Sequence, residues 1–360
     1  IRYALAAGKS VTVAEIIERH RKTEMNQDRW YVISRWLDML PEEIVRQRIA
    51  LMLAQTFSLF EKFRLLEMIP ILDQIEAKLH AEKSDPSLKA EAKFYRGYIL
   101  IYLHGDGKGA LKLLQEAQEQ IPESDEMIRA EIELYLAMAR QMTGEGELAI
   151  KSLEKNIRME KSPSGIIFSR LLGGLVFLHM HLGNLERAYS ATGRLAKFAK
   201  QENLAYVETF AQYIAANVNL NLFDLEQGFK DFSSAIEKKD IVNVKISVDI
   251  MAGLILTCQF LGRTDQAMNI MERLVEFAQK TGDSIHITVA ESCNARLLLM
   301  QGELKKTIEW ARIFETDTHV PSMNFWLEIP VITQSRIFIV AGTDDNVVRT
   351  LGVLDSLGKQ

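Results

Sequence analysis

Apolar residues recur along most of the chain at intervals of three and four, which places them on one face of an α-helix. Leu148, Ile150, Leu153 and Ile157 form one such stripe. The sequence has no strong run of alternating apolar and polar residues, so the pattern favours helices over strands. From residue 87 on it predicts seven helix pairs. The first helices are expected over about 87–104, 126–143, 165–182, 203–222, 242–261, 283–301 and 323–341, and the second helices over about 107–121, 146–160, 185–201, 225–238, 265–280, 304–316 and 345–357.

The turns inside these pairs return at a fixed interval. Each holds a Gly, or a substitute for it, and a second, usually small residue five positions later: Gly105/Ala110, Gly144/Ala149, Gly183/Ala188, Phe223/Gly228, Gly262/Ala267, Gly302/Thr307 and Gly342/Val347. Subtracting successive turn positions gives steps of 39, 39, 40, 39, 40 and 40. Such a period is the signature of a repeat array. We therefore predict an all-α fold, a right-handed superhelix built on this period of 39–40, with the first helix of each pair on its inner wall.

Both fixed positions have a physical reason. Gly just after a helix reaches a positive φ without strain at Cβ. The small residue lies where two helices cross closely, and a larger side chain would push them apart. Phe223 replaces the Gly of its repeat, so we expect that turn to differ in detail. Thr307 and Val347 are larger than Ala, so the last two pairs are expected to be looser or to cap the array.

The amino-terminal part is less regular. A helix end is expected at Tyr3–Gly8, helices at about 12–22 and 27–39, and a helix start at Pro41, where Pro and the following acidic residues suit the first turn. A pair at about 45–59 and 62–80 is an irregular first repeat. We assign residues 1–41 to a helical linker from an upstream domain and residues 42–360 to a repeat superhelix of about eight pairs. We expect the chain to be a segment of a longer protein.

Composition narrows the possible partners. The 360 residues carry a formal net charge of −5, so we expect no direct contact with DNA. Cys258 and Cys293 lack metal-site spacing and are interpreted as buried thiols in a reducing compartment. No apolar run approaches the roughly 20 residues of a membrane span, and the start does not resemble a signal peptide. We expect a cytoplasmic protein with no membrane contact.

Candidate catalytic motifs are weak. Gly8-Lys9-Ser10 ends like a phosphate-binding loop, but position 3 is Tyr3 instead of Gly, and a helix precedes the motif where a strand is needed. His179 and His181 point about 200° apart on a helix, so they cannot share a metal ion. We expect no enzyme activity, no metal and no cofactor in this chain.

The repeat resembles the tetratricopeptide repeat, which places a Gly at the turn and a small residue five positions later. Pro122, at position +17 counted from Gly105, also matches that pattern. The period here is 39–40, against 34 in the tetratricopeptide repeat, so the helices or the turns between repeats are longer.

The amino-terminal portion, residues 1–60, resembles a narrower family, the large ATP-dependent LuxR-family transcriptional regulators of the MalT type. The resemblance is carried by Tyr3-Ala4-Leu5-Ala6-Ala7-Gly8, by Trp36-Leu37-x-x-Leu40-Pro41, and by the apolar helix Ile49–Phe60. The sequence departs from the family in Lys9 after Gly8, and in Arg48-Ile49 where Pro-Leu is common.

The resemblance implies a role for the chain. In that family the nucleotide site lies upstream of this segment and the DNA-binding helix-turn-helix lies downstream, so any ATPase activity would belong to the upstream domain. The helical repeats receive a small-molecule inducer or a protein partner and control self-association of the full-length protein. The alternative is a stand-alone tetratricopeptide scaffold that binds protein segments and has no regulatory role.

The tetratricopeptide resemblance also predicts a surface. Counted from the turn Gly, the inner-wall positions in such helices are −13, −10, −6, −3 and −2. Carried onto this sequence, most are apolar, such as Leu134, Met138, Leu256 and Leu299. The polar and aromatic ones can bind a small polar metabolite or an extended peptide. The predicted groove comprises Tyr95, Arg170, His181, Tyr213, Asn217, Asn221, Asp249, Gln259 and Arg296, with Tyr102, Glu131 and Arg336 given by the same rule. We expect Arg170, Tyr213, Asn217 and Asp249 to line its recognition surface.

Overall fold

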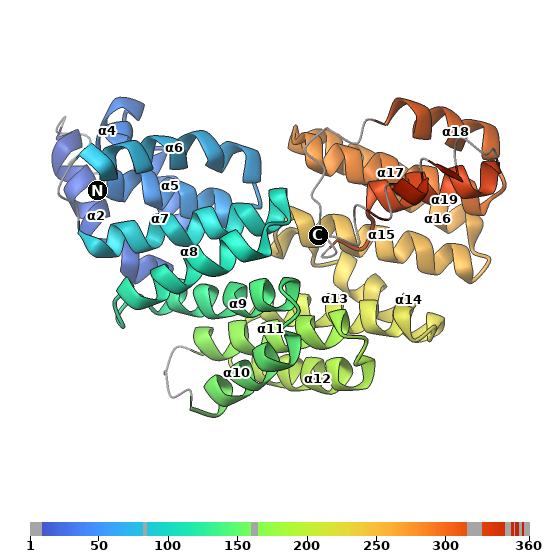
Figure 1. Cartoon of the computed structure of the whole chain (residues 1–360), viewed down its shortest axis with the longest axis horizontal. Helices are drawn as coiled ribbons and strands as arrows, with labels where there is room; N and C mark the ends of the chain where they lie inside the picture. The colour runs from blue at the N-terminus through green and yellow to red at the C-terminus, as the bar shows by residue number, and fades with distance from the viewer. Residues whose placement is uncertain are drawn as a thin grey trace. The chain divides into compact units, whose positions relative to one another are not determined.

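The computed structural model describes residues 9–81, 85–159, 165–314, 326–342, 347–348, 350–352 and 355. Every regular element in these ranges is a helix (Figure 1), which confirms the all-α prediction for the part of the chain described. The helix end expected at Tyr3–Gly8 lies outside the described residues. So does much of the last helix expected over 345–357, although residues 347–348, 350–352 and 355 are helical.

The chain divides into two compact units. Unit 1 comprises Ile1–Ile101 and Asp106–Leu182, and unit 2 comprises Tyr102–Gly105 and Gly183–Gln360. The helices of unit 1 are α2 (Ser10–Met25), α3 (Trp30–Leu37), α4 (Glu42–Gln47), α5 (Ile49–Glu61), α6 (Leu65–Ala81), α7 (Pro86–Ile99), α8 (Gly107–Gln120), α9 (Glu126–Met142), α10 (Gly146–Met159) and α11 (Ile166–His181). After α7, residues Leu100–His104 form a short π-helix.

In unit 1 the helices pack on one another in chain order from α5 to α11, and α7, α9 and α11 also form a layer of neighbouring first helices. The helices α2 and α3 pack against α5, so the segment before residue 42 is docked on the first repeat. The core of this unit includes a cluster of aromatic rings, with Phe60 within 6.3 Å of Phe94, Tyr95, Tyr98 and Tyr135, measured between ring centroids. The boundary near residue 41 stays a prediction.

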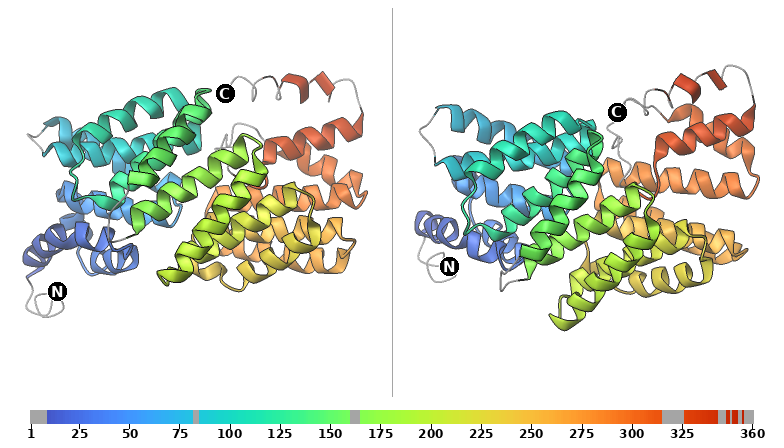
Figure 2. Two further views of the ribbon diagram at one scale, coloured as in Figure 1. Left: turned by 90° about the horizontal axis from the view of Figure 1, so that it is seen from below. Right: turned by 60° about the horizontal axis from the view of Figure 1, so that its bottom comes forward.

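Unit 2 contains α12 (Leu185–Gln201), α13 (Ala205–Asn221), α14 (Leu225–Ile236), the 3-10 turn Lys239–Ile241, α15 (Val244–Phe260), α16 (Thr264–Thr281), α17 (Ser284–Met300), α18 (Leu304–Ile313) and α19 (Pro330–Ala341). Neighbours in the chain pack together, and α13, α15, α17 and α19 form the layer of first helices. In Figure 2 the helices of this unit run from yellow-green through orange to red along the chain.

The turns follow the expected geometry, with one correction. The turn glycines from Gly105 to Gly342 have φ between 62° and 86°. Phe223, where we expected a different turn, has φ 61°. Its N–H bonds to the Leu220 carbonyl, as the N–H of Gly262 does to the Gln259 carbonyl. That expectation is wrong, because the pairing of the flanking helices enforces the left-handed conformation on a residue that disfavours it.

The small residues also lie where the repeat predicts. Ala149 and Ala188 have no exposed surface. The largest difference in helix bounds is α19, which begins at Pro330 instead of about residue 323, because Pro suits the first turn of a helix. Residues 326–329 before it are not helical, and they matter for the site described below.

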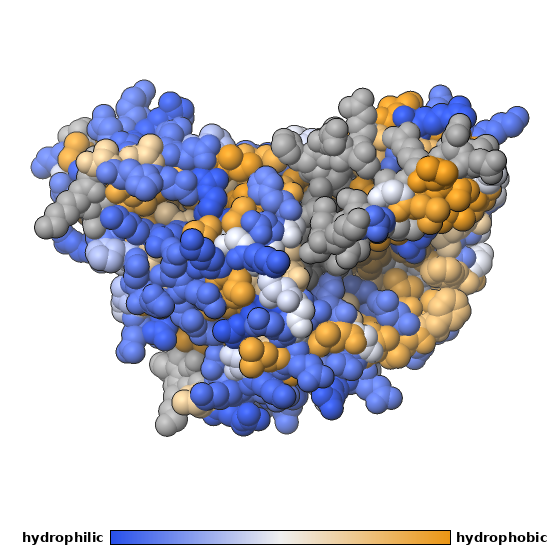
Figure 3. Space-filling model, in the orientation of Figure 1, coloured by the Kyte–Doolittle hydropathy of each residue, from blue (hydrophilic) through white to orange (hydrophobic). Residues whose placement is uncertain are grey.

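The surface of the molecule is mixed. On the face shown in Figure 3, hydrophilic residues predominate over α8 to α10, and larger hydrophobic patches lie on the side of α14 to α19. Large apolar side chains exposed in unit 2 include Phe223, Phe260 and Ile313. Within the described residues, no helix combines the length and the hydropathy that crossing a membrane requires.

Candidate ligand-binding surface

The first helices of unit 2 bring polar side chains together on one face. Tyr213 on α13 donates a hydrogen bond from Oη to Oδ2 of Asp249 on α15, at 2.8 Å. Lys245, one turn before Asp249, donates from Nζ to the same oxygen at 2.7 Å. Asp249 is fully buried and Tyr213 is 1% exposed. Burial, followed by the adjacent Asp249 charge, raises the pKa of Tyr213 well above its ordinary value, so the phenol remains a donor at neutral pH.

A short non-helical segment of the same chain, residues 326–328, lies against this face. The backbone N–H of Leu327 donates to Asp249 Oδ1 at 3.1 Å, so the Asp249 carboxylate accepts from three groups. The Trp326 ring lies 5.5 Å from Lys245 Nζ and 6.0 Å from the His286 ring. Trp326 is only 5% exposed. The inner face therefore contacts this segment through one backbone N–H and one aromatic ring.

Glu328 completes this contact. Its carboxylate is fully buried and accepts from Ser292 Oγ at 2.7 Å and from Arg296 Nη1 at 3.0 Å. Thr333 Oγ1 on α19 donates to the same carboxylate. A buried charge is costly unless it is paired and hydrogen-bonded. Ser292, Arg296 and Thr333 meet that requirement, so they form a binding site for one carboxylate.

Unit 1 has a second group of buried charges. Arg170 on α11 pairs with Glu131 on α9, with 2.7 Å between Nε and Oε1, and it lies 3.5 Å from Asp28 and 3.9 Å from Glu61. One guanidinium thus faces three carboxylates. Burial, followed by the charge of Asp28, raises the pKa of Glu61 well above its ordinary value. Burial also raises the pKa of Glu131, against the opposing effect of Arg170.

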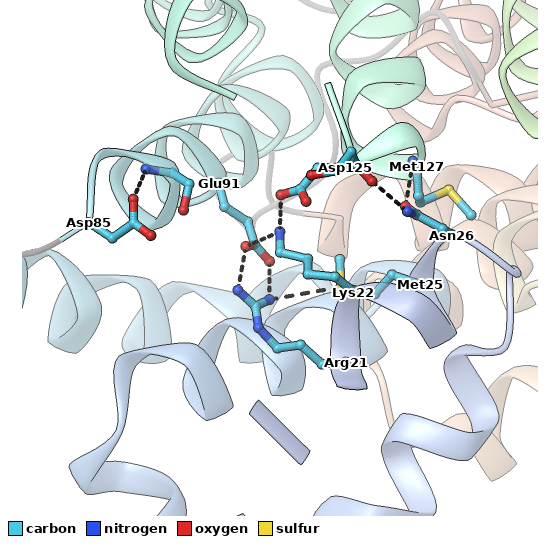
Figure 4. A network of polar contacts seen from close by, with 10 residues as sticks. Arg21, Lys22, Met25, Asn26, Asp85, Glu91, Asp125 and Met127 are labelled. Atoms are coloured by element: carbon cyan, nitrogen blue, oxygen red, sulfur yellow. Dashed lines mark hydrogen bonds and ion pairs between the residues drawn. The ribbon is translucent and has the colours of Figure 1, made fainter. Parts of the chain in front are cut away.

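Figure 4 shows a third network, in which α2 is bound to the first repeats. Arg21 donates from both terminal nitrogens to Glu91 on α7, at 2.7 and 2.8 Å. Lys22 lies 2.7 Å from Glu91 and 2.7 Å from Asp125, and Asn26 accepts from the Met127 N–H. Burial would raise the pKa of Glu91, but the charges of Arg21 and Lys22 outweigh it and lower the pKa to about 2. The network therefore holds an ionised carboxylate.

The residues predicted for the groove fall in both units. Tyr95, Arg170 and His181 are in unit 1, whereas Tyr213, Asn217, Asn221, Asp249, Gln259 and Arg296 are in unit 2. Several pair with inner-wall neighbours: Glu131 with Arg170, Tyr213 with Asp249, and Gln259 with Gln301, whose amide donates to it at 3.2 Å. Their binding of a ligand stays a prediction.

The remaining predicted residues have simpler surroundings. Tyr95 is fully buried among aromatic rings, and its Oη has no hydrogen-bond partner in the described part of the chain. His181 stacks on Phe177, with 5.5 Å between ring centroids. Asn221 is exposed and donates to the side chain and carbonyl of Asn217 on the preceding turn. These contacts lie within unit 1 for Tyr95 and His181 and within α13 for Asn221.

Sequence reasoning missed Lys245, Trp326 and Glu328. Lys245 stands four residues before Asp249, a spacing that pairs opposite charges on one helix face. Pro330 is a signal for a helix start at residue 330. Residues 326–329 would then lie outside the helix. No local signal indicates that this segment lies on α15 and α17. Its contacts reach helices that are distant in the sequence, as that of Leu327 with Asp249 does.

A family model described as the MalT-like TPR region matches residues 90–360. The chain belongs to this family. The match covers both units from α7 onward and agrees with the resemblance seen in residues 1–60. A comparison with curated protein sequences finds no relative.

Solved structures share the fold of this MalT-like TPR region. A Rap protein complexed with Competence and Sporulation Factor is similar with a TM-score of 0.61 at 13% identity, over 98% of this chain and 99% of that one. NprR in complex with its cognate peptide NprX is similar with a TM-score of 0.56 at 14% identity, over 93% and 97%. At these identities the likeness shows the fold alone.

A third similar structure comes from Pyrococcus horikoshii. It is a signal transduction ATPase with numerous domains that carries a tetratricopeptide repeat sensor, with a TM-score of 0.53 at 14% identity. The match covers 93% of this chain and 54% of that protein, so this chain corresponds to about half of it. The tetratricopeptide-like helical-repeat fold expected from the period is confirmed.

Proposed function

We propose that this chain is the effector-sensing module of a signal transduction ATPase that regulates transcription, and that the effector binds on the inner helices of unit 2. The observation that carries the proposal is a set of charged and hydrogen-bonding groups on α15 and α17 that already holds the non-helical segment 326–328. Tyr213 on α13 supports this set through its hydrogen bond to Asp249. The first helices of a repeat array present such groups toward one concave side, where extended ligands bind.

The comparisons support the same role. The family is the MalT-like TPR region, and one similar structure is a signal transduction ATPase with a tetratricopeptide repeat sensor. The Rap and NprR structures each contain a bound factor or peptide. In our proposal the chain has no catalytic role and needs no cofactor. Nucleotide hydrolysis and DNA binding belong to other domains of a cytoplasmic protein, and effector binding controls its self-association.

The full reading frame tests the ATPase part of the proposal. We expect it to encode a phosphate-binding loop before residue 1 and a helix-turn-helix after residue 360. A frame that encodes neither would contradict the proposal and would favour the alternative, a stand-alone tetratricopeptide scaffold that binds protein segments.

Thermal shift tests the sensing part. A ligand that binds the folded state raises the melting temperature by mass action. We expect one member of a panel of sugars, aromatic acids and short peptides to raise the melting temperature of wild type but not that of Arg296→Gln. The matched control is Arg312→Gln, which changes an exposed residue on α18. A ligand whose effect survives Arg296→Gln and is lost in Arg312→Gln would place the binding surface elsewhere.

A further inference from the structure

Three consecutive residues before α19 contact the inner helices of unit 2, each by a different interaction. Trp326 places its ring beside Lys245 and His286. Leu327 contributes its backbone N–H to Asp249. Glu328 contributes its carboxylate to Ser292 and Arg296. Both Trp326 and Glu328 are almost completely buried, although neither lies in a helix.

These three interactions have the form of peptide recognition. In peptide recognition, main-chain hydrogen bonds can supply affinity and pockets for individual side chains can supply specificity. Asp249 accepts the main-chain N–H, and the Leu327 side chain is not part of that contact. The pocket at Arg296 is specific for a carboxylate, and the surface at Lys245 suits the face of an aromatic ring, since a cation over a ring is attracted to it.

The charges of the pocket match an acidic ligand. Arg296 donates directly to the Glu328 carboxylate. Arg336, one turn after Thr333 on α19, also lies nearby. Burial and then the charge of Arg296 lower the pKa of Arg336, and the Glu328 charge opposes this effect. Arg296 is therefore the guanidinium that pairs with the Glu328 carboxylate, and it is left without this partner when that carboxylate is withdrawn.

We propose that residues 326–328 are an internal ligand of the effector site, and that the effector is a peptide segment with an aromatic residue, any residue and then an acidic residue, which replaces them. This rests on the proposed sensing function and specifies its ligand class. The effector and the internal segment then compete for Asp249 and Arg296, so the site exists in a self-occupied state and in an effector-bound state.

The tether sets the strength of that competition. A segment held in the same chain acts at an effective concentration on the order of millimolar. A free peptide of the same sequence therefore binds the wild-type chain weakly. Weakening the internal segment removes its competitor, and the free peptide then binds more tightly at an otherwise unchanged site.

The test uses the intact 360-residue chain and a synthetic peptide. The peptide carries the sequence of residues 326–331, Trp-Leu-Glu-Ile-Pro-Val, acetylated at its start and labelled with fluorescein at its end. Fluorescence anisotropy measures its dissociation constant. We expect the double variant Trp326→Ala, Glu328→Gln to bind at least about tenfold more tightly than wild type. Adding Arg296→Gln to the double variant should abolish that gain.

Two peptide controls separate recognition from adhesion. A peptide with an N-methyl group on Leu lacks the donor for Asp249, and a peptide with Gln in place of Glu lacks the carboxylate. Each should bind the double variant at least about tenfold more weakly than the parent peptide. Equal binding of all three peptides would overturn the proposal.

Folding of the variants is checked by far-ultraviolet circular dichroism. If the double variant loses its helical signal, Trp326→Ala alone is used, because Glu328 then keeps its ion pair. A folded variant that binds the peptide no better than wild type would show that residues 326–328 are a fixed part of unit 2 and would overturn the proposal. If the peptide binds as expected but the full reading frame encodes no ATPase, this proposal is retained and the proposed function is refuted.

Discussion

At the scale of single residues, two buried carboxylates in unit 1 have opposite electrostatic surroundings. Glu91 faces two cations, Arg21 and Lys22, at 2.7 Å each. Glu61 lies 3.9 Å from one guanidinium, which Glu131 and Asp28 also contact. The same chemical group is therefore stabilised as an anion at one position and disfavoured as an anion at the other. The substitution of Gln for Glu should change stability in opposite directions at the two sites.

Glu91→Gln should destabilise the fold at pH 7. The native pKa of Glu91 is lowered from 4.5 to about 2, which corresponds to about 3 kcal/mol. Because the pKa of Glu91 is lower in the folded state, its ionised form stabilises the fold above the unfolded-state pKa of 4.5. This stabilisation is lost as the pH falls from 4.5 toward 2. Urea unfolding from pH 7 to pH 3 should show a loss of about 3 kcal/mol in the variant at pH 7 that shrinks at acid pH.

Glu61→Gln should instead stabilise the fold at pH 7. Burial and then the charge of Asp28 raise the pKa of Glu61 in the folded state. Glu61 therefore stabilises the fold below its unfolded-state pKa, and this stabilisation is lost as the pH rises through its folded-state pKa. We expect the variant to be more stable than wild type at pH 7 and equally stable near pH 4, measured in the same urea series. If Glu61→Gln instead lowers the stability at pH 7, the attraction of Arg170 outweighs the cost of burying the Glu61 charge.

Phe223 allows the left-handed strain to be measured. It has φ 61°, is 64% exposed, and its ring lies 5.5 Å from the Phe260 ring. Phe223→Gly and Phe223→Ala both remove the ring contact, but only Gly adopts positive φ without strain. We expect Gly to be more stable than Ala by about 1 kcal/mol in chemical denaturation. Equal stabilities would show that the turn relaxes in the variants.

At the scale of elements, the small residues of the repeat are buried at the start of the second helices. Ala149 in the first turn of α10 and Ala188 in that of α12 have no exposed surface. Changing either to Leu should destabilise by roughly 1–3 kcal/mol through overpacking. Ala77→Leu on the exposed face of α6 is the matched control and should have little effect. Unchanged denaturation midpoints for both buried sites would remove the steric explanation of the repeat.

The helices could be predicted from the sequence because each carries its own signals. The turn glycines, the apolar stripes and the following acidic residues gave bounds within a few residues for most helices between residue 86 and residue 313. The inner-wall rule also found Tyr213, Asp249 and Arg296. It could not find Trp326 and Glu328, because a segment without periodicity has no pattern that records which distant helices it contacts.

At the scale of the whole molecule, the period passes through residue 183 without interruption, yet the chain divides there into two compact units. A period records the length of a repeat and not which repeats group into one compact unit, so the division could not be predicted. Repeat arrays are stabilised by contacts between neighbouring repeats. The fragment 183–360 contains α12 to α19 and lacks only Tyr102–Gly105 of unit 2, so it keeps the contacts between neighbouring helices.

Residues 183–360 alone should therefore fold. We expect a helical circular dichroism spectrum and a cooperative urea transition, with a smaller denaturant dependence than the full chain because less surface is exposed on unfolding. The matching fragment 1–182 should behave in the same way. A broad, non-cooperative transition in the fragment 183–360 would show that unit 2 depends on unit 1 for its stability.

The polar pairs between first helices distinguish one repeat from another, because each pair needs two particular repeats as neighbours. Glu131 and Arg170 occupy the same position, −13 counted from the turn Gly, in successive repeats, and Tyr213 meets Asp249 across the next but one boundary. Removing the repeat that contains Glu131 would place Ala92 at the position next to Arg170 and leave a buried guanidinium without its closest carboxylate. A deletion, duplication or exchange of a single repeat would therefore separate these pairs. The glycine turns would be unaffected, because they are interchangeable between repeats.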